Sequence, residues 1–321
     1  MIRFLILRLM ATIPVMGVVA MVVFALVRLD KGKAAAQLAG DNATPEIIAR
    51  ISAQLGLDRP IWEQFLIWVG ELLQGDLGRS VQSRIPVLTL IGDRIEPTLS
   101  LAATTLVYSV AIAVPMGILA AWQQGRLLDR VIMVLSVIGF SVPVFVLGYT
   151  LILTLPMWLG ERYPGLFGWL QVQGFHSLGE GLGPFLSTIV LPTLALSGIY
   201  IALVARITRA SMLEALAQDY IRTAHAKGAT TRRVLTRHAL RNAAVPIVSV
   251  IGIGLVLLIG GVVVTETVFN IPGIGRLTVE AILGADYPII QGVLLVFSVI
   301  YVLINLLIDV LYTLLDPRIR Y

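Results

Sequence analysis

The basic residues at positions 206–241 form the most concentrated charge pattern in this chain of 321 residues. Eight arginines and lysines stand there against two acids, so the segment carries +6 while the whole chain carries +5. Guanidinium and ammonium groups donate charge-assisted hydrogen bonds to carboxylates and phosphates. This segment, the basic loop, is therefore suited to bind anionic lipid headgroups, nucleic acid or a docked protein. Its bases are Arg206, Arg209, Arg222, Lys227, Arg232, Arg233, Arg237 and Arg241.

The residues alone leave two of these three partners as candidates, anionic lipid headgroups and a docked protein. Nucleic acid is disfavoured, because long apolar runs on both sides would hold the basic loop against a membrane. Anionic headgroups would contribute about 1 kcal/mol for each base near the surface. Docking of a cytoplasmic protein fits the same residues, and periodicity does not separate it from lipid binding.

Helical spacing predicts how the basic loop is built. Apolar residues recur at intervals of three and four from position 212 to 226, which predicts one helix. Lys227 and Gly228 end it with a cation in the last turn and a glycine free to adopt a left-handed conformation. Thr230 or Thr231 can cap a second helix that runs on past Asn242, so we expect two helices hinged at Gly228. The apolar positions of the first helix are Leu213, Leu216, Ala217, Tyr220 and Ala224.

The composition places these helices in a membrane protein. The chain is 57% hydrophobic and only 13% charged, with a mean hydropathy of +0.90, whereas ordinary globular domains have about 25% charged residues. Each uncharged stretch is long enough to cross a bilayer and must then be helical to satisfy its own backbone. We predict an all-α membrane protein with six transmembrane helices, at residues 9–27, 99–122, 131–158, 184–205, 242–265 and 287–308.

The distribution of basic residues predicts the orientation of these helices. Fourteen bases lie on the side of the two termini and the basic loop, against two, Arg162 and Arg276, in the opposite short loops. Because bases accumulate in cytoplasmic loops, we expect both termini and the basic loop in the cytoplasm. The long segment 28–98, with eight bases and nine acids, is expected outside, where residues 61–73 form an amphipathic helix.

Several chemistries are excluded by what the sequence lacks. Without cysteine there is no disulfide, no thiolate metal site and no cysteine nucleophile. The three histidines belong to no H-E-x-x-H motif, and no G-x-S-x-G motif is present, so an enzyme is disfavoured and we predict no catalytic or metal site. No G-x-x-x-x-G-K-[ST] loop is present to hold nucleotide phosphates, so no cofactor is expected on this chain.

A transport function fits the remaining features. A secondary transporter or a channel of six helices, not coupled to ATP, is one alternative, although such carriers usually place ionisable groups at the midplane, and the six stretches carry no charge. Polar residues inside the stretches either line a translocation path or join helices by hydrogen bonds. The candidates for a path are Tyr108, Ser141, Tyr149, Gln291 and Asn305.

Four motifs, in order along almost the whole chain, resemble one known family. Asp219-Tyr220-Ile221-Arg222-Thr223-Ala224-His225-Ala226-Lys227-Gly228-Ala229, followed by Arg232-Arg233-Val234 and Arg237-His238, is similar to the cytoplasmic coupling loop of ABC-transporter permeases of the dipeptide/oligopeptide/nickel import family. The outer run Gln74-Gly75-Asp76-Leu77-Gly78-Arg79-Ser80 resembles that family's external segment. Its last external loop is matched by Glu266-Thr267-Val268-Phe269, Pro272-Gly273-Ile274-Gly275 and Asp286-Tyr287-Pro288, and its tail by Leu315-Asp316-Pro317-Arg318.

This resemblance implies a type I ABC importer permease fold. Residues 1–94 would form a first transmembrane helix and an external segment, and residues 95–316 the permease domain with its coupling loop at 206–241. The residues expected to meet an ATPase are Asp219, Tyr220, Arg222, Thr223, Ala224, Lys227, Gly228, Ala229, Arg232, Arg233 and Arg237. One departure is Arg222, because the broad permease superfamily has a glutamate at that distance before the loop glycine.

The resemblance also implies partners. A second, similar permease would complete the pore in a bacterial inner membrane, and two cytoplasmic ATPase subunits would hold ATP and Mg²⁺. An extracytoplasmic binding protein would deliver a peptide or a related small solute, which would cross by alternating access.

Overall fold

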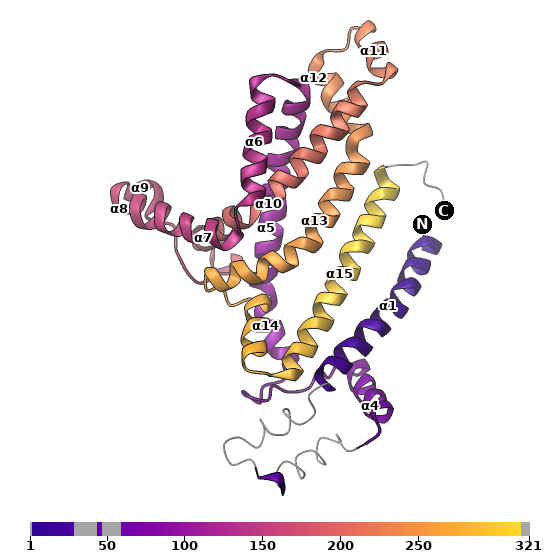
Figure 1. The fold of residues 1–321 in the computed structure, drawn as a ribbon, viewed down its shortest axis with the longest axis vertical. Helices are drawn as coiled ribbons and strands as arrows, with labels where there is room; N and C mark the ends of the chain where they lie inside the picture. Colours follow the sequence, from indigo (N-terminus) through magenta and orange to yellow (C-terminus); the bar gives the residue numbers. More distant parts are fainter. Residues whose placement is uncertain (1, 29–43, 47–58, 316–321) are drawn as a thin grey trace. The chain divides into compact units, whose positions relative to one another are not determined.

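The computed structural model describes residues 2–28, 44–46 and 59–315 (Figure 1). Within these ranges the chain is helical apart from turns, loops and one isolated antiparallel bridge between Arg79 and Pro86. This confirms the predicted all-α class. Part of the predicted outer segment and most of the tail motif lie outside the described residues. The fold has two compact units, the first made of Met1–Ile95 with Arg276–Leu303 and the second of Glu96–Gly275 with Ile304–Tyr321.

The described ranges contain six long apolar helical runs, the same number as the predicted spans. Helix α1 (Ile2–Arg28) contains the apolar window Met10–Ala25. Five further helical runs are long and apolar enough to cross a membrane. They are Val87–Trp122, Val144–Arg162, Leu182–Leu216, Thr231–Val268 and Tyr287–Tyr312.

The predicted span 131–158 is wrong as a single helix. Helix α6 (Leu127–Ser141) ends before Pro143, and α7 (Val144–Ile152) begins after it. Val142 between them is extended, with φ −85° and ψ 121°. A proline drives the preceding residue out of the helical region and cannot supply a backbone N–H, so Pro143 separates the helices. The run then continues through a π-helical segment (Leu153–Leu159) and α8 (Gly160–Arg162), followed by α9 (Pro164–Phe167).

The first unit holds most of the described part of the segment 28–98 that is predicted to be external. Helix α4 (Ile61–Leu73) forms over the predicted residues, and its Phe65 ring packs edge-on against Phe24 of α1 with centroids 5.2 Å apart. Ser80 donates a hydrogen bond of 2.5 Å to the buried carboxylate of Asp286, just before α15 (Tyr287–Leu315). Two motifs that lie 206 residues apart in sequence are therefore joined within this unit.

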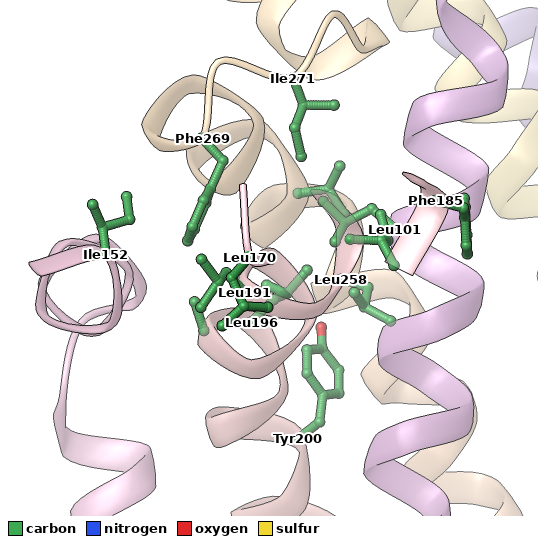
Figure 2. Close-up of a cluster of buried hydrophobic side chains, with 13 residues drawn as sticks. Leu101, Ile152, Leu170, Phe185, Leu191, Leu196, Tyr200, Leu258, Phe269 and Ile271 are labelled. Carbon is green, nitrogen blue, oxygen red and sulfur yellow. The ribbon is translucent and has the colours of Figure 1, made fainter. Parts of the chain in front are cut away.

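The second unit is organised around α10 (Leu182–Leu216). This helix packs against α6, α7 and α13 (Leu240–Val268), and 67% of its most apolar window is buried, more than in any other candidate span. Figure 2 shows the main core, in which Leu196 and Tyr200 of α10 lie near Leu258 of α13 and Leu101 of α5 (Val87–Trp122). The basic loop begins in the last part of α10 and ends in the first turn of α13. Both helices that carry its ends therefore belong to this core.

Candidate functional site

The basic loop begins inside a helix and then breaks. Helix α10 runs on to Leu216, and α11 (Asp219–Ala226) starts only after Gln218, which is extended with ψ 150°. The predicted single helix 212–226 is therefore wrong. The break also changes the helical phase, because α11 buries Ile221 and Ala224, while Ala217 and Tyr220 of the predicted stripe are exposed.

The elbow at Gly228 agrees with the sequence prediction. Its φ of +80° lies in the left-handed region that favours glycine. Its N–H donates to the His225 carbonyl at 2.9 Å, and the Ala229 N–H donates to the Ala224 carbonyl at 3.1 Å. These two bonds form a Schellman motif, which satisfies carbonyls at the end of α11.

The chain leaves the elbow directly into the next long helix. The Thr230 hydroxyl accepts the Arg233 N–H at 3.5 Å and caps α12 (Thr231–Arg233). A π-helical segment (Val234–Ala239) then leads without a break into α13. The predicted second helix and its threonine cap are therefore confirmed, with Thr230 as the capping residue.

The buried apolar side chains of the basic loop pack against neighbouring helices of the second unit. Met212, Ile221 and Val234 are at most 4% exposed and pack in one cluster. The same cluster includes Ala121 of α5 and Ile247 of α13. Burying a side chain such as Ile221 contributes roughly 2 kcal/mol. The basic loop is therefore a packed element of the fold and not a free linker.

The residues predicted to meet an ATPase lie mostly on the opposite, exposed face. Ala224 is buried and Ala229 half-buried. The other nine are exposed: Asp219, Tyr220, Arg222, Thr223, Lys227, Gly228, Arg232, Arg233 and Arg237. Arg222 donates to Asp219 at 3.4 Å, but their side chains are 82% and 93% exposed, so this pair contributes little to stability. The Arg222 guanidinium remains accessible to a partner.

A groove of about 480 Å³ adjoins this exposed face. Its walls come from the end of α10, the start of α11 and the start of α13. Glu214, Gln218 and Asn242 give it a polar lining, and the break before α11 places Tyr220 at its edge. The remaining lining residues are Ser211, Ala215, Ala243 and Pro246. Sequence reasoning missed this groove because it depends on that break.

Two of the eight bases contact α6 instead. Arg206 lies over the Phe140 ring, with its Cζ 5.1 Å from the ring centroid. Arg209 donates to both carboxylate oxygens of Asp129, from Nε at 2.6 Å and from Nη2 at 2.8 Å. The hydrogen bond from Arg209 holds the pKa of Asp129 below its ordinary value, with a further contribution from the Gly125 N–H. This ion pair, in which Asp129 is buried and Arg209 half-buried, was not predicted.

A second unpredicted polar contact lies at the other end of α13. Glu266 is fully buried and accepts a hydrogen bond of 2.6 Å from the Thr98 hydroxyl of α5. The same hydroxyl accepts the Ile274 N–H at 2.8 Å, at the start of α14 (Ile274–Leu283). Gly273 lies so close that a Cβ there would overlap the Glu266 carboxylate. The sequence showed Glu266, Gly273 and Ile274 only as parts of a family motif and did not single out Thr98.

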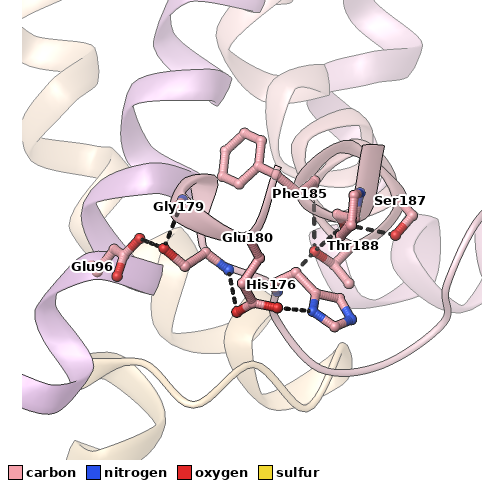
Figure 3. A network of polar contacts seen from close by, with 9 residues as sticks. Glu96, His176, Gly179, Glu180, Phe185, Ser187 and Thr188 are labelled. Atoms are coloured by element: carbon pink, nitrogen blue, oxygen red, sulfur yellow. Dashed lines mark hydrogen bonds and ion pairs between the residues drawn. The ribbon is translucent and has the colours of Figure 1, made fainter. Parts of the chain in front are cut away.

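An exposed network of polar contacts lies in the loop before α10 (Figure 3). Ser177 caps the short helix Leu178–Glu180 and donates its hydroxyl to Glu96. His176 Nδ1 lies 2.6 Å from the Glu180 carboxylate. The hydrogen bond from His176, followed by the Ser177 N–H, lowers the pKa of Glu180. This network orders the entry into α10.

The five path candidates occupy four different helices. Tyr108 is half-buried on α5, and Tyr149 of α7 is 54% exposed. The Ser141 hydroxyl donates to the Val137 carbonyl of its own helix at 2.8 Å. Gln291, in the first unit, is buried, and Asn305, in the second, is half-buried, both on α15. Their role in a path stays a prediction.

Two models of known protein families match this chain, one over its N-terminal part and one over most of the rest. Residues 113–321 match the family of binding-protein-dependent transport system inner membrane components, and residues 1–102 match the N-terminal family of such membrane components. The chain is 52% identical to a probable peptide ABC transporter permease protein of Sinorhizobium fredii over 98% of both chains. It is 40% identical to the glutathione transport system permease protein GsiC of Escherichia coli over the full length of both.

A solved structure shares the fold. The MetNI methionine ABC transporter in an inward-facing conformation superposes with a TM-score of 0.58 at 18% identity, covering 71% of this chain and 97% of that one. A secondary transporter or an uncoupled channel gains no support from any of these matches. The chain belongs to the family of binding-protein-dependent transport system inner membrane components, the permease subunits of ABC importers.

Proposed function

We propose that a separate ATPase subunit docks on the exposed face of the basic loop and drives this permease through it. The observation that carries the proposal is the two-sided construction of the basic loop. Its apolar side is packed into the cluster around Met212 and Ile221, while its charged side faces outward. A push on α11 would reach α10 through the turn at Gln218 and α13 through the elbow at Gly228. Both of these helices belong to one packed core.

ATP hydrolysis would take place on partner subunits. ATP and Mg²⁺ would be held by two cytoplasmic ATPase subunits, since this sequence has no phosphate-binding loop. Both termini and the basic loop would then lie in the cytoplasm. A second permease subunit would complete the translocation path, and an extracytoplasmic binding protein would deliver the solute. Closure of the ATPases would shift the population between inward-facing and outward-facing states.

The substrate class that we propose is a peptide or a glutathione-like tripeptide. This rests on the relatives, of which the one at 52% identity is named for peptides and the one at 40% for glutathione. The path would be lined by polar side chains from several helices, with Tyr108, Ser141, Tyr149, Gln291 and Asn305 as candidates.

Reconstitution with one component left out at a time tests the proposal. Vesicles holding this chain, the second permease, both ATPases and the binding protein are expected to take up a labelled peptide or glutathione only with hydrolysable ATP. A non-hydrolysable ATP analogue is the control for nucleotide binding without turnover. Omission of this chain is expected to reduce uptake to background. The chain alone is expected to show no ATP hydrolysis.

Two outcomes would contradict this account. Crosslinking of a photoactive ATP analogue to this chain alone would show a nucleotide site that the sequence does not predict. Uptake driven by an ion gradient without any ATPase subunit would instead support a secondary transporter.

A further inference from the structure

The Asp129–Arg209 ion pair joins α6 to the part of α10 in which the basic loop begins. Asp129 lies in the first turn of α6, and Arg209 lies two turns before the end of α10. Both carboxylate oxygens are engaged by Arg209, and one of them also accepts the Gly125 N–H at 2.9 Å. The pair therefore ties α10 to α6 and to the turn that connects α5 with α6.

This pair is not accessible enough to serve as a docking site. The side chains of Asp129 and Arg209 are only 5% and 25% exposed. The guanidinium already forms a two-point fork with the carboxylate, the geometry in which arginine is most specific. A partner protein would have to break this fork before it could use either charge, so the pair acts within this chain.

A close approach of α5 to α10 lies beside the pair. A Cβ added at Gly117 of α5 would lie 2.5 Å from the Cβ of Thr208 and 2.7 Å from the Ala205 carbonyl oxygen. The Thr208 side chain is fully buried. Two adjacent residues of α10 therefore contact two different helices. Thr208 packs against Gly117 of α5, and Arg209 binds Asp129 of α6.

An ion pair does something here that apolar packing does not. Burying two charges seldom adds net stability compared with a well-packed apolar pair, but removing one partner leaves a costly unpaired charge. A two-point fork also fixes direction, because sliding or rotating α10 against α6 would break at least one of its hydrogen bonds. Apolar side chains at this position would allow such sliding.

We infer that the Asp129–Arg209 pair is a positioning device that makes α6 and the α5–α6 turn move together with α10 when the basic loop is displaced. The inference rests on the proposed function, because it requires an ATPase that acts on the basic loop. Neither residue touches solute or nucleotide. Their effect is on how much solute is moved for each ATP hydrolysed.

Arg209→Lys is the most informative variant. It keeps a positive charge opposite the buried Asp129, so the chain is expected to fold, but it removes the two-point fork. In the reconstituted transporter, solute moved per ATP is expected to fall about tenfold, within the range of known coupling effects. Asp129→Asn is expected to have at least as large an effect, and the exchange Asp129→Arg with Arg209→Asp is expected to recover part of the loss.

Two further readouts separate this inference from the proposed function. Recovery of the ATPase subunits on this chain and their rate of ATP hydrolysis are expected to stay close to those of the unmodified chain, because the pair lies away from the exposed docking face. If the unmodified chain itself recovers no ATPase, the proposed function fails, whatever these variants do. If Arg209→Lys loses ATPase recovery, the pair supports docking and not transmission, which overturns the inference.

An exposed ion pair provides the matched control. Arg59 and Glu63 lie 3.1 Å apart with side chains 51% and 38% exposed, so Glu63→Gln removes a carboxylate without disturbing a buried fork. This variant is expected to leave solute per ATP unchanged. Unchanged solute per ATP in both Arg209→Lys and Asp129→Asn, with normal assembly, would also overturn the inference.

Discussion

Gly228→Asp is expected to abolish solute uptake while the chain still inserts into the membrane normally. The φ of +80° makes any L side chain strained at this elbow, at a cost of about 1 kcal/mol or somewhat more. Among the described residues, apart from its two chain neighbours, none has an atom within 4 Å of where the new Cβ would be. The fold therefore tolerates the change, and loss of uptake would come from bulk and charge on a surface that a partner contacts. Uptake and co-purification of the ATPase subunits are the measurements.

The chain offers a close control for backbone strain. Gly75 has φ +82° and follows α4 with the same Schellman pair of hydrogen bonds. In the described part of the chain, nothing beyond its two neighbours lies within 4 Å of an added Cβ. Gly75→Asp thus carries the same backbone cost on the external segment, and uptake is expected to persist. Gly228→Asn, which tolerates a left-handed conformation better, is expected to lose uptake because it still adds bulk.

Lipid binding alone predicts a different pattern for the basic loop. Gly228→Asp would then matter little, and removing any exposed arginine would reduce membrane insertion to a similar degree. Full uptake with normal ATPase recovery in Gly228→Asp would leave the docking assignment without support.

Gly273→Ala is expected to destabilise the chain by about 3 kcal/mol, by combining overpacking with the loss of a hydrogen bond to a buried charge. The added methyl group would overlap the Glu266 carboxylate, which is fully buried, so the carboxylate would have to shift. Displacing it would break the bond from Thr98 and disturb the start of α14. Thermal unfolding of the purified chain in detergent is the measurement, with a midpoint expected to fall by several degrees.

The control is the same substitution elsewhere on the chain. Gly260 lies within α13, and a Cβ there would meet no described residue within 4 Å outside the backbone of its own helix. Gly260→Ala is expected to be neutral or to stabilise the helix by up to about 1 kcal/mol. Equal unfolding midpoints for the two variants would show that Glu266 is not held as the structure indicates.

Features governed by local rules were predictable from the sequence. Hydropathy predicted the number of apolar helices, and the Lys227–Gly228 ending and the Thr230 cap followed from the residues that favour helix ends. Two breaks were missed because each depends on one residue in an otherwise regular pattern. Pro143 separates α6 from α7, and extended Gln218 separates α10 from α11.

Contacts between distant residues were not predictable from one sequence. Asp129 and Arg209 are 80 residues apart, and Thr98 and Glu266 are 168 apart. Nothing in their local sequence shows which charge or hydroxyl each will meet, because helix packing brings them together. Arg209 was accordingly counted among the loop bases, although its charge is used inside the fold. The path candidates stay predictions, since a path that a second permease subunit would complete depends on the proposed assembly.

The most direct test of ATPase docking on the basic loop is thiol labelling of a Thr223→Cys variant. Thr223 is exposed on α11, and the chain has no other cysteine. We expect a membrane-impermeant thiol reagent to label it in inside-out vesicles but not in intact cells, and bound ATPase subunits to slow that labelling strongly. Gln74→Cys, exposed on the external segment, is expected to react in intact cells, with or without the ATPases. Labelling of Thr223→Cys in intact cells, or at the same rate with and without bound ATPases, would contradict the account.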